Sequence, residues 1–406
     1  MFELGQLFES VSDPRRAGYR QKYRLCDLLM LCLCAVLSGA NSFTEIAWYG
    51  RLYRDLLVER LGLQFRESTP SHDTLGRLFS LLDGAALIAC FEAWMAHLHQ
   101  ATQGEVVALD GKTVCGSFDS ATGGKALHLV SAFACETRLV LGLEEAASVG
   151  QEVEAMHALL SRLELKGRTV SMDAAGAEPK MASLIVSRQG HYVLALKANH
   201  RHLHEDVAAF FAWLDKVERG VTGPAGAGLE WQESRHSEGG HGRIESRRVR
   251  AVSVQFLREF VTPSLAQWPH LQSVVMVERL RKNRVRGQDH RTVTRAYYLS
   301  SLPVRQPADV QRLGQAIRAH WSIENGQHWV LDVVWVLDVV WQEDASRVRK
   351  DQAPKNLALL RRLATNIMRQ DTTYDISLSL KRKTAAWNTD FLLQKLVGAK
   401  PLPTKT

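Results

Sequence analysis

The chain has 406 residues, of which 46% are apolar and 23% are charged, and its formal net charge is +8. This length provides two or three domains with ample cores, and the composition excludes a disordered or fibrous protein. The longest apolar stretch, residues 28–37, is too short to span a membrane and begins too late for a signal peptide, so we expect a cytoplasmic protein whose basic charge favours an anionic partner.

Residues 1–100 are expected to form a small helical domain. The apolar run at 28–37 suits a buried helix, residues 43–50 suit a second one, and Ser71 caps a third helix after the break at Thr69-Pro70. The same residues fit a purely structural domain and a DNA-contacting one, and both interpretations stay open.

Residues 101–210 are typical of an α/β domain. Apolar strands at 106–109, 128–134 and 139–143 are followed by a helix at 151–165, a strand at 169–172, a helix at 179–188 and a strand at 192–196. Three strands followed by helix–strand units with short connections predict the first part of a ribonuclease-H-like core.

Two acidic residues end strands of this core: Asp110 follows the first strand and Asp173 follows the fourth. In a ribonuclease-H-like core these strand ends are neighbours, and Glu324, on an expected helix at 308–330, supplies a third carboxylate. Carboxylate oxygens are the ligands that Mg²⁺ prefers, and two such ions activate an attacking oxygen and stabilise a leaving one. The alternatives are an Asp-Gly turn at Asp110 and a chance triple, because the chain has 43 acidic residues.

The long separation of Asp173 and Glu324 requires an insertion, which we place at residues 211–305. Alternating polar and apolar residues around Val252 and Val275 predict mostly β structure there. Its many cations are predicted to follow the phosphates of DNA, with solvated hairpin faces as the alternative. The contacts expected from this insertion are Arg243, Arg247, Arg281, Lys282 and Arg284.

Residues 306–375 are expected to complete the core, and residues 376–406 to form a basic C-terminal tail. His320 and His328 stand four residues before and after Glu324, so a regular helix places all three on one face. His320 contacts phosphate or tunes Glu324, although a packing role fits as well. Further phosphate contacts are expected from Lys112, Lys197, Arg347 and Lys350.

A six-residue segment, Trp-Val-Leu-Asp-Val-Val, occurs twice in succession, at 329–334 and 335–340. It is too short to be a solenoid repeat and indicates a local duplication. The duplication displaces the residues that follow it, including Glu343-Asp344, and leaves Glu324 upstream.

Four short blocks occur in order along the chain: Leu109-Asp110-Gly111-Lys112, Met172-Asp173-Ala174-Ala175-Gly176, His320-Trp321-Ser322-Ile323-Glu324-Asn325 and Glu343-Asp344-Ala345-Ser346-Arg347. With them the chain resembles, over nearly its whole length, the DDE transposases of bacterial insertion sequences, in the branch of the H-repeat-associated proteins. The resemblance implies a ribonuclease-H-like fold with a β insertion and a catalytic, metal-binding triad of Asp110, Asp173 and Glu324. It also implies two Mg²⁺ or Mn²⁺ ions and double-stranded DNA as the partner of a homo-oligomer.

Three functional hypotheses follow from the sequence. The first is a transposase that cleaves and joins DNA at insertion-sequence ends. The second is a catalytically impaired copy that binds DNA without transposing, because the family pattern has one copy of the hexapeptide and this chain has two. The third is a nuclease that acts on RNA–DNA hybrids.

Overall fold

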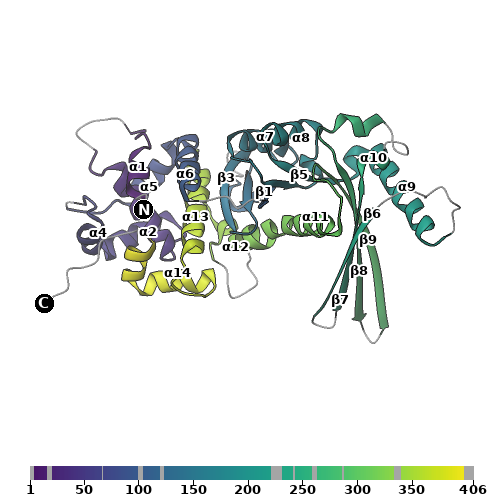
Figure 1. Ribbon diagram of the computed structural model, residues 1–406. Coiled ribbons are helices and arrows are strands. Elements are labelled where there is room, and N and C mark those ends of the chain that lie inside the picture. Colours follow the sequence, from purple (N-terminus) through teal and green to yellow (C-terminus); the bar gives the residue numbers. More distant parts are fainter. Residues whose placement is uncertain are drawn as a thin grey trace.

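The computed structural model of the chain describes residues 4–15, 21–65, 67–98, 104–118, 123–220, 231–240, 243–257, 263–285, 288–332 and 340–396. These residues form a helical part, a central α/β part and an arm of long strands, arranged in a row (Figure 1). Within these ranges no single helix is both long and apolar enough to cross a membrane, although the bent pair His72–Leu81 and Gly84–Ala96 meets the two criteria jointly.

The helical part buries the longest apolar run of the sequence. Its first helices are α1 (Leu4–Glu9), α2 (Leu25–Leu37), α3 (Phe43–Leu52), α4 (Arg54–Leu61), α5 (His72–Leu81) and α6 (Gly84–Leu98). α2 is buried on nearly every side, which explains why its sequence is apolar throughout and not amphipathic. Ser71 caps α5 as predicted, because its side chain accepts a hydrogen bond from the backbone N–H of Thr74.

The central part is a sheet with helices on both faces. Its elements are β1 (Val106–Val114), β2 (Leu127–Ala134), β3 (Leu139–Ala146), α7 (Glu152–Arg162), β4 (Thr169–Met172), α8 (Pro179–Ser187), β5 (His191–Leu196) and α11 (Pro307–His320). The strand order is β3-β2-β1-β4-β5, with β4 parallel to β1 and β5, and β2 antiparallel to β1 and β3. α7 and α8 lie on one face and α11 on the other (Figure 1). The predicted β-β-β-α-β-α-β order is therefore present.

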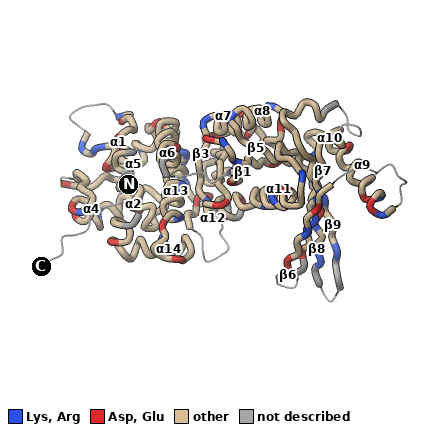
Figure 2. The backbone as a smooth tube through the Cα atoms, viewed as in Figure 1, with Lys and Arg blue, Asp and Glu red and all other residues tan. Residues whose placement is uncertain are grey.

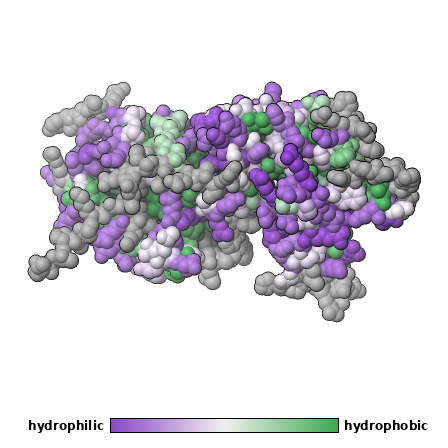
Figure 3. All heavy atoms as spheres, viewed as in Figure 1, coloured by the Kyte–Doolittle hydropathy of each residue, from purple (hydrophilic) through white to green (hydrophobic). Residues whose placement is uncertain are grey.

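The insertion continues this sheet as an arm. The helix α9 (Arg201–Glu218) leads into it, and it contains β6 (Trp231–Gly240), β7 (Arg243–Ser253), α10 (Val254–Leu257), β8 (Ser273–Val285) and β9 (Gln288–Ser300). β9 pairs antiparallel with β5, and β8, β7 and β6 follow in order, so the described strands form one nine-stranded sheet. We call β6–β9 the β arm; basic residues gather along it in Figure 2, and its described surface is hydrophilic in Figure 3. The prediction of mostly β structure is correct, with α9 as an unexpected helix before it.

The chain returns to the helical part after α11. α13 (Ala353–Gln370) lies against α2, α5 and α6 on one side and β3 on the other, so it connects the helical part to the sheet. Neighbours on both sides bury almost every residue of α13.

The described part of the expected basic C-terminal tail is a packed helix, α14 (Leu378–Trp387), followed by a π-helical turn at Phe391–Leu396, and residues 397–406 lie outside the described residues. Arg382 is buried, donates hydrogen bonds to the carbonyl oxygens of Val36 and Ala40, and lies 4.4 Å from the ring of Trp341. Arg382 therefore serves packing, because its partners Val36, Ala40 and Trp341 lie far from it in sequence.

Candidate active site

Asp110 and Asp173 lie side by side at the edge where two parallel strands stop pairing. The last pair between β1 and β4 is Leu109 with Met172, and each acid is the next residue along its strand. Asp173 follows the end of β4 as expected. β1 does not end at Asp110, because its pairing with β2 carries it on to Val114. Asp110 therefore lies inside a continuous strand and not in an Asp-Gly turn.

Backbone N–H groups orient both carboxylates. Asp110 Oδ1 accepts a hydrogen bond from the N–H of Gly111 at 2.9 Å, and Asp173 Oδ1 accepts one from the N–H of Ala175 at 2.8 Å. Hydrogen bonds of this kind favour the charged form of a carboxyl group. The two side chains are thus fixed as acceptors at neighbouring positions.

The opposite face of β1 is closed by a buried histidine. The ring of His128 lies between Thr113 Oγ1, 2.9 Å from Nδ1, and Glu152 Oε1, 2.9 Å from Nε2. A Cβ on Gly111 would lie 2.6 Å from His128 Nε2 and 3.1 Å from Glu152 Cγ. Glycine is therefore required directly after Asp110, because any larger residue would displace the His128–Glu152 pair.

Glu324 begins a π-helical turn, Glu324–His328. α11 ends at His320, but helical backbone resumes after Trp321 and continues to Asp332, so the predicted helix at 308–330 is present with a break and this turn. Turns of this kind are frequent at functional sites, since the extra residue changes the direction of the side chains. The single helix face expected for His320, Glu324 and His328 is thus interrupted, and the side chain of His328 lies outside the described residues.

A buried glutamine anchors this turn next to Asp110. Gln327 Nε2 donates a hydrogen bond of 2.8 Å to Ser131 Oγ, and Gln327 is 1% exposed. Ser131 on β2 is the direct cross-strand partner of Asp110 on β1. Paired residues of antiparallel strands have their side chains on the same face. Gln327 therefore holds the Glu324 turn on the sheet face that carries the Asp110 side chain.

The three carboxylates lie within electrostatic reach of one another. Burial, followed by the charges of Asp173 and Glu324, raises the pKa of Asp110 to about 7. In the described part of the chain, no three Asp, Glu, His or Cys side chains lie close enough together to hold a metal ion as they stand. The charges of Asp173 and Glu324 thus act on Asp110, and the repulsion favours the protonated form of its carboxyl group.

Two basic side chains border Asp173. Lys197, on the exposed segment after β5, has its Nζ 4.0 Å from Asp173 Oδ2. Burial lowers the pKa of His320, so its ring is neutral at neutral pH, while the nearby charge of Asp173 acts in the opposite direction. Lys197 and His320, two of the residues expected to contact phosphate, therefore lie near Asp173.

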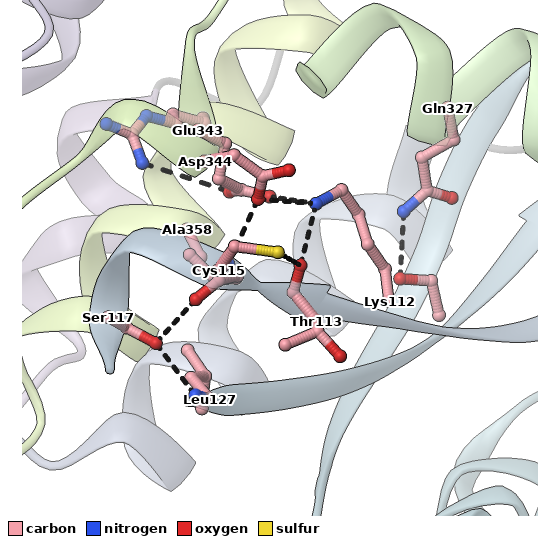
Figure 4. A network of polar contacts seen from close by, with 12 residues as sticks. Lys112, Thr113, Cys115, Ser117, Leu127, Gln327, Glu343, Asp344 and Ala358 are labelled. Carbon is pink, nitrogen blue, oxygen red and sulfur yellow. Dashed lines mark hydrogen bonds and ion pairs between the residues drawn. The ribbon is translucent and has the colours of Figure 1, made fainter. Parts of the chain in front are cut away.

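Lys112 differs from its predicted role as a phosphate contact. Its side chain is buried, with Nζ 3.3 Å from Asp344 Oδ1 and 3.8 Å from Glu343 Oε2 (Figure 4). Glu343 is fully buried and also receives Arg362 through contacts of 2.8 and 3.2 Å. We call Lys112, Glu343, Asp344, Arg361 and Arg362 the Glu343 cluster. The Lys112 ammonium is neutralised inside this cluster, so its position gives no support to a direct contact with DNA.

Most of the arginines of the β arm whose side chains the structure describes are paired with acids, where the sequence predicted a strip of cations with few acids. Glu245 alone contacts Arg247, Arg279 and Arg281 at 2.6, 3.3 and 3.1 Å. Other partners come from α9, since Asp215 contacts Arg295 at 2.7 Å. These acids are close in space and scattered in sequence, so counting cations along the chain overestimated the free positive charge.

The remaining predicted DNA contacts fall into two groups. Lys282 on β8 and Arg347 and Lys350 after the duplicated hexapeptide are exposed. Arg243 on β7 and Arg284 on β8 belong to described strands, but their side chains lie outside the described residues. Of these predicted contacts, Arg347 and Lys350 line a groove between the helical part and residues 342–350.

Sequence reasoning missed the polar residues that support the triad, namely Gln327, Ser131, His128 and Glu152. Each is an ordinary polar residue in its segment, and its partner lies far away along the chain, so no local pattern identifies it. The Glu343 cluster had one sequence signal, because Glu343-Asp344 opens a block that resembles the transposase family.

Buried residues occur within the first copy of the hexapeptide and directly after the second. Leu331, in the first copy, is 1% exposed and belongs to the helix α12 (Trp329–Asp332). Trp341, directly after the second copy, is fully buried. Residues 333–339, which include nearly all of the second copy, lie outside the described residues.

Comparison with known proteins gives matches over most of the chain. Residues 101–367 match the family described as "Transposase DDE domain", and residues 6–95 match the one described as "DDE_Tnp_1-associated". The chain is 32% identical over 401 residues to "Putative transposase YncI" of Escherichia coli O157:H7, covering 98% of this chain and 95% of that protein. It is 29% identical over 399 residues to "H repeat-associated putative transposase YhhI" of Escherichia coli strain K12, covering 98% and 99%.

Proposed function

Because the chain belongs to the DDE transposases of bacterial insertion sequences, we propose that it cleaves DNA at the ends of such an element and joins the strands to target DNA by phosphoryl transfer. The observation that carries the proposal is the position of Asp110 and Asp173 at one sheet edge, with the charge of Glu324 within electrostatic reach of Asp110. Asp110 and Asp173 share one sheet edge, and Glu324 lies on a turn that is hydrogen-bonded to the strand opposite Asp110. The family itself indicates DNA as the partner.

The central part, on this proposal, is a ribonuclease-H-like core. The strand order β3-β2-β1-β4-β5 supports this assignment. β2 runs antiparallel to its neighbours β1 and β3, and β4 runs parallel to its neighbours β1 and β5. The β arm enters between β5 and α11 and extends the same sheet. The insertion therefore leaves the Glu324 turn free to return to the edge that carries Asp110 and Asp173.

Asp110, Asp173 and Glu324 would hold the divalent metal ions that DDE transposase domains generally use, and we propose two Mg²⁺ or Mn²⁺ ions. A ligand set made only of oxygens suits these hard cations. Such ions, when bound, activate the attacking oxygen and stabilise the leaving oxygen of a phosphodiester. The repulsion among the three carboxylates supports the assignment, because bound cations would neutralise it.

The chain's own basic residues would position the substrate. Lys197 carries a cation to the edge of Asp173, where it can contact a non-bridging phosphate oxygen. His320, neutral at neutral pH, can exchange a hydrogen bond with the same phosphate. We further propose that the protein acts on double-stranded DNA as a homo-oligomer.

The alternative of a catalytically impaired copy is not favoured. The residues around the second copy of the hexapeptide are buried: Gln327 before both copies, Leu331 within the first copy, and Trp341 and Glu343 after the second. The Gln327–Ser131 hydrogen bond beside Asp110 and the Glu343 cluster are therefore both formed in a chain that carries two copies.

Cleavage of DNA that carries the chain's own element ends tests the proposed function. The substrate is a duplex with the inverted repeats that flank the gene, incubated with Mg²⁺, with Mn²⁺ or with EDTA. We expect strand breaks at the repeat boundary with either metal and none with EDTA, and equal cleavage by a variant that lacks residues 335–340. Absence of cleavage, or cleavage of an RNA–DNA hybrid in place of the duplex, would contradict the proposal. Cleavage only by the deletion variant would support the impaired copy.

Ser131 is expected to act as a positioning residue for Glu324. Threonine and valine have the same shape, but only threonine keeps the hydroxyl that accepts from Gln327 Nε2, so Ser131→Val should lose the bond that Ser131→Thr keeps. Because small misplacements of reacting groups are costly, we expect Ser131→Val to cleave roughly 10- to 100-fold more slowly than Ser131→Thr. Single-turnover cleavage, measured at a temperature where both variants are folded, tests this. DNA affinity should be equal in the two variants, whereas Ser131→Val should be less stable by about 1–3 kcal/mol because Gln327 Nε2 is left buried without its acceptor. Equal rates would show that the bond does not position Glu324.

A further inference from the structure

A groove lies where the helical part meets the segment that follows the duplicated hexapeptide. It has a volume of about 660 Å³. One wall is formed by residues 41–45 and by the first turns of α5, and the other by residues 342–350. We call it the junction groove. Its two walls come from segments more than 250 residues apart in sequence, so no local sequence pattern predicts the groove.

The junction groove carries cations without acidic partners. Arg77 on α5 and Arg347 and Lys350 on the facing wall are exposed, and none of them forms an ion pair with a carboxylate of the described chain. The acids in the groove are partly engaged, since Glu45 accepts from the backbone N–H of Asn41 and Asp73 lies 3.5 Å from His72 Nε2. The groove therefore offers positive charge that the protein itself does not neutralise.

The β arm gives the contrasting case. Its arginines are more numerous, but Glu245 pairs with Arg247 and Arg281, and Asp215 pairs with Arg295. A cation already paired with a carboxylate must break that pair before it can bind a phosphate, which reduces its net contribution to binding. The arginines of the arm that have acidic partners are thus already engaged, whereas Arg77, Arg347 and Lys350 of the junction groove offer their charge directly.

The wall with Arg347 is fixed relative to the triad. Asp344 Oδ1 accepts the backbone N–H of Cys115 at 3.0 Å, just beyond the end of β1. Gly116 packs so tightly here that a Cβ would lie 2.2 Å from the carbonyl oxygen of Ser346. β1 also carries Asp110, so an anion in the groove is held at a set distance from the cleavage site.

We propose that the junction groove binds the phosphate backbone of duplex DNA and fixes its position relative to Asp110, Asp173 and Glu324. The inference rests on the proposed function and adds a binding site to it. The helical part then has a direct role in DNA binding, because Arg77 supplies one wall of the groove. Phosphate contacts of this kind position DNA without reading its sequence.

The test compares charge-reversal variants in the full-length protein: R77E, R347E, K350E and the triple combination. K180E is the matched control, because Lys180 is an exposed cation on α8, away from the groove. Binding of a fluorescently labelled duplex of arbitrary sequence is measured by anisotropy over a range of salt concentrations, with EDTA present to prevent cleavage. Each lost phosphate contact should reduce the slope of log affinity against log salt concentration by about 0.9.

We expect the slope to fall by about 0.9 in each single variant, which corresponds to one phosphate contact, and by about three times as much in the triple variant. K180E should match the wild-type protein. A triple variant that melts like wild type and keeps the wild-type slope would overturn the proposal. If the triple variant is unstable, the single variants decide by the same criterion. Wild-type cleavage of element ends is scored separately, so unchanged slopes in an active protein refute the groove alone, whereas an inactive wild-type protein refutes the proposed function.

Discussion

Asp110→Asn is expected to abolish DNA cleavage while leaving DNA binding and folding intact. Asparagine has the shape of aspartate and can still accept the N–H of Gly111, so the strand and its pairing with Ser131 should persist. The change removes a negative oxygen donor from the proposed metal site. Metal ions contribute several kcal/mol of transition-state charge stabilisation, and each 1.36 kcal/mol is a factor of ten, so we expect a loss of about 10³-fold or more.

The same variant should be more stable than the wild-type protein at neutral and basic pH when no divalent metal is present. Burial and the charges of Asp173 and Glu324 raise the pKa of Asp110 from 3.8 to about 7. A raised pKa means that the folded state prefers the protonated form. The contribution of Asp110 to the stability of the wild-type protein is therefore fully present below pH 3.8 and is lost as the pH rises through 7. Asparagine has no such dependence. Melting temperatures in EDTA should therefore diverge in favour of Asp110→Asn over this range.

Two controls separate the chemistry from the fold. Glu164→Gln changes an exposed carboxylate on the loop before β4 and should cleave like wild type. DNA affinity in EDTA should be equal or slightly higher in Asp110→Asn, since a negative charge is removed. Wild-type cleavage by Asp110→Asn would remove Asp110 from the triad, and loss of folding would show that its role is structural.

Local sequence patterns predicted the individual strands and the residues at which their apolar runs end. The apolar runs that end at Leu109 and Met172 gave the strands, and their parallel pairing puts Asp110 and Asp173 at one edge. The continuation of β1 to Val114 was not predicted, because Asp110-Gly111 has the composition of a turn and only pairing with β2 keeps it extended.

Features that depend on distant partners could not be predicted. Lys112 looks like a cation beside a catalytic aspartate, yet Glu343 and Asp344, its partners, come more than 200 residues later. In the β arm the error had the same origin, because Asp215 on α9 is remote in sequence from Arg295. Charge in a folded protein is set by neighbours in space, and a single sequence provides only neighbours along the chain.

Glu343→Ala is expected to destabilise the protein more than any other single change in the region of the site. Glu343 is fully buried and lies 2.8 Å from Arg362, 3.8 Å from Lys112 and 3.9 Å from Arg361. Burial by itself would raise the pKa of Glu343, but Arg362, Arg361 and Lys112 together hold it below its usual value. Removing the shared carboxylate leaves these cations buried without their partner, and breaking a buried pair in this way costs about 3–5 kcal/mol.

Urea unfolding and melting temperature measure this loss, and the pH dependence identifies its cause. A lowered pKa means that the contribution of Glu343 is fully present above its ordinary value of 4.5 and is lost as the pH falls through the folded value. The gap between Glu343→Ala and wild type should therefore narrow in acid. Glu205→Ala, which breaks the exposed Arg201–Glu205 pair, should show almost no change at any pH.

Glu343→Ala also tests whether the cluster supports the triad. Lys112 follows Asp110 by two residues, so its side chain leaves the same face of β1, and releasing its ammonium frees that end of the strand. At a temperature where the variant is folded, cleavage should fall while DNA binding through the junction groove also weakens, because Asp344 and Arg347 share the freed segment. A variant that is as stable as wild type would mean that the cations find other partners. A variant that is destabilised but fully active when folded would mean that the cluster stabilises the junction of the helical part and the sheet without positioning Asp110.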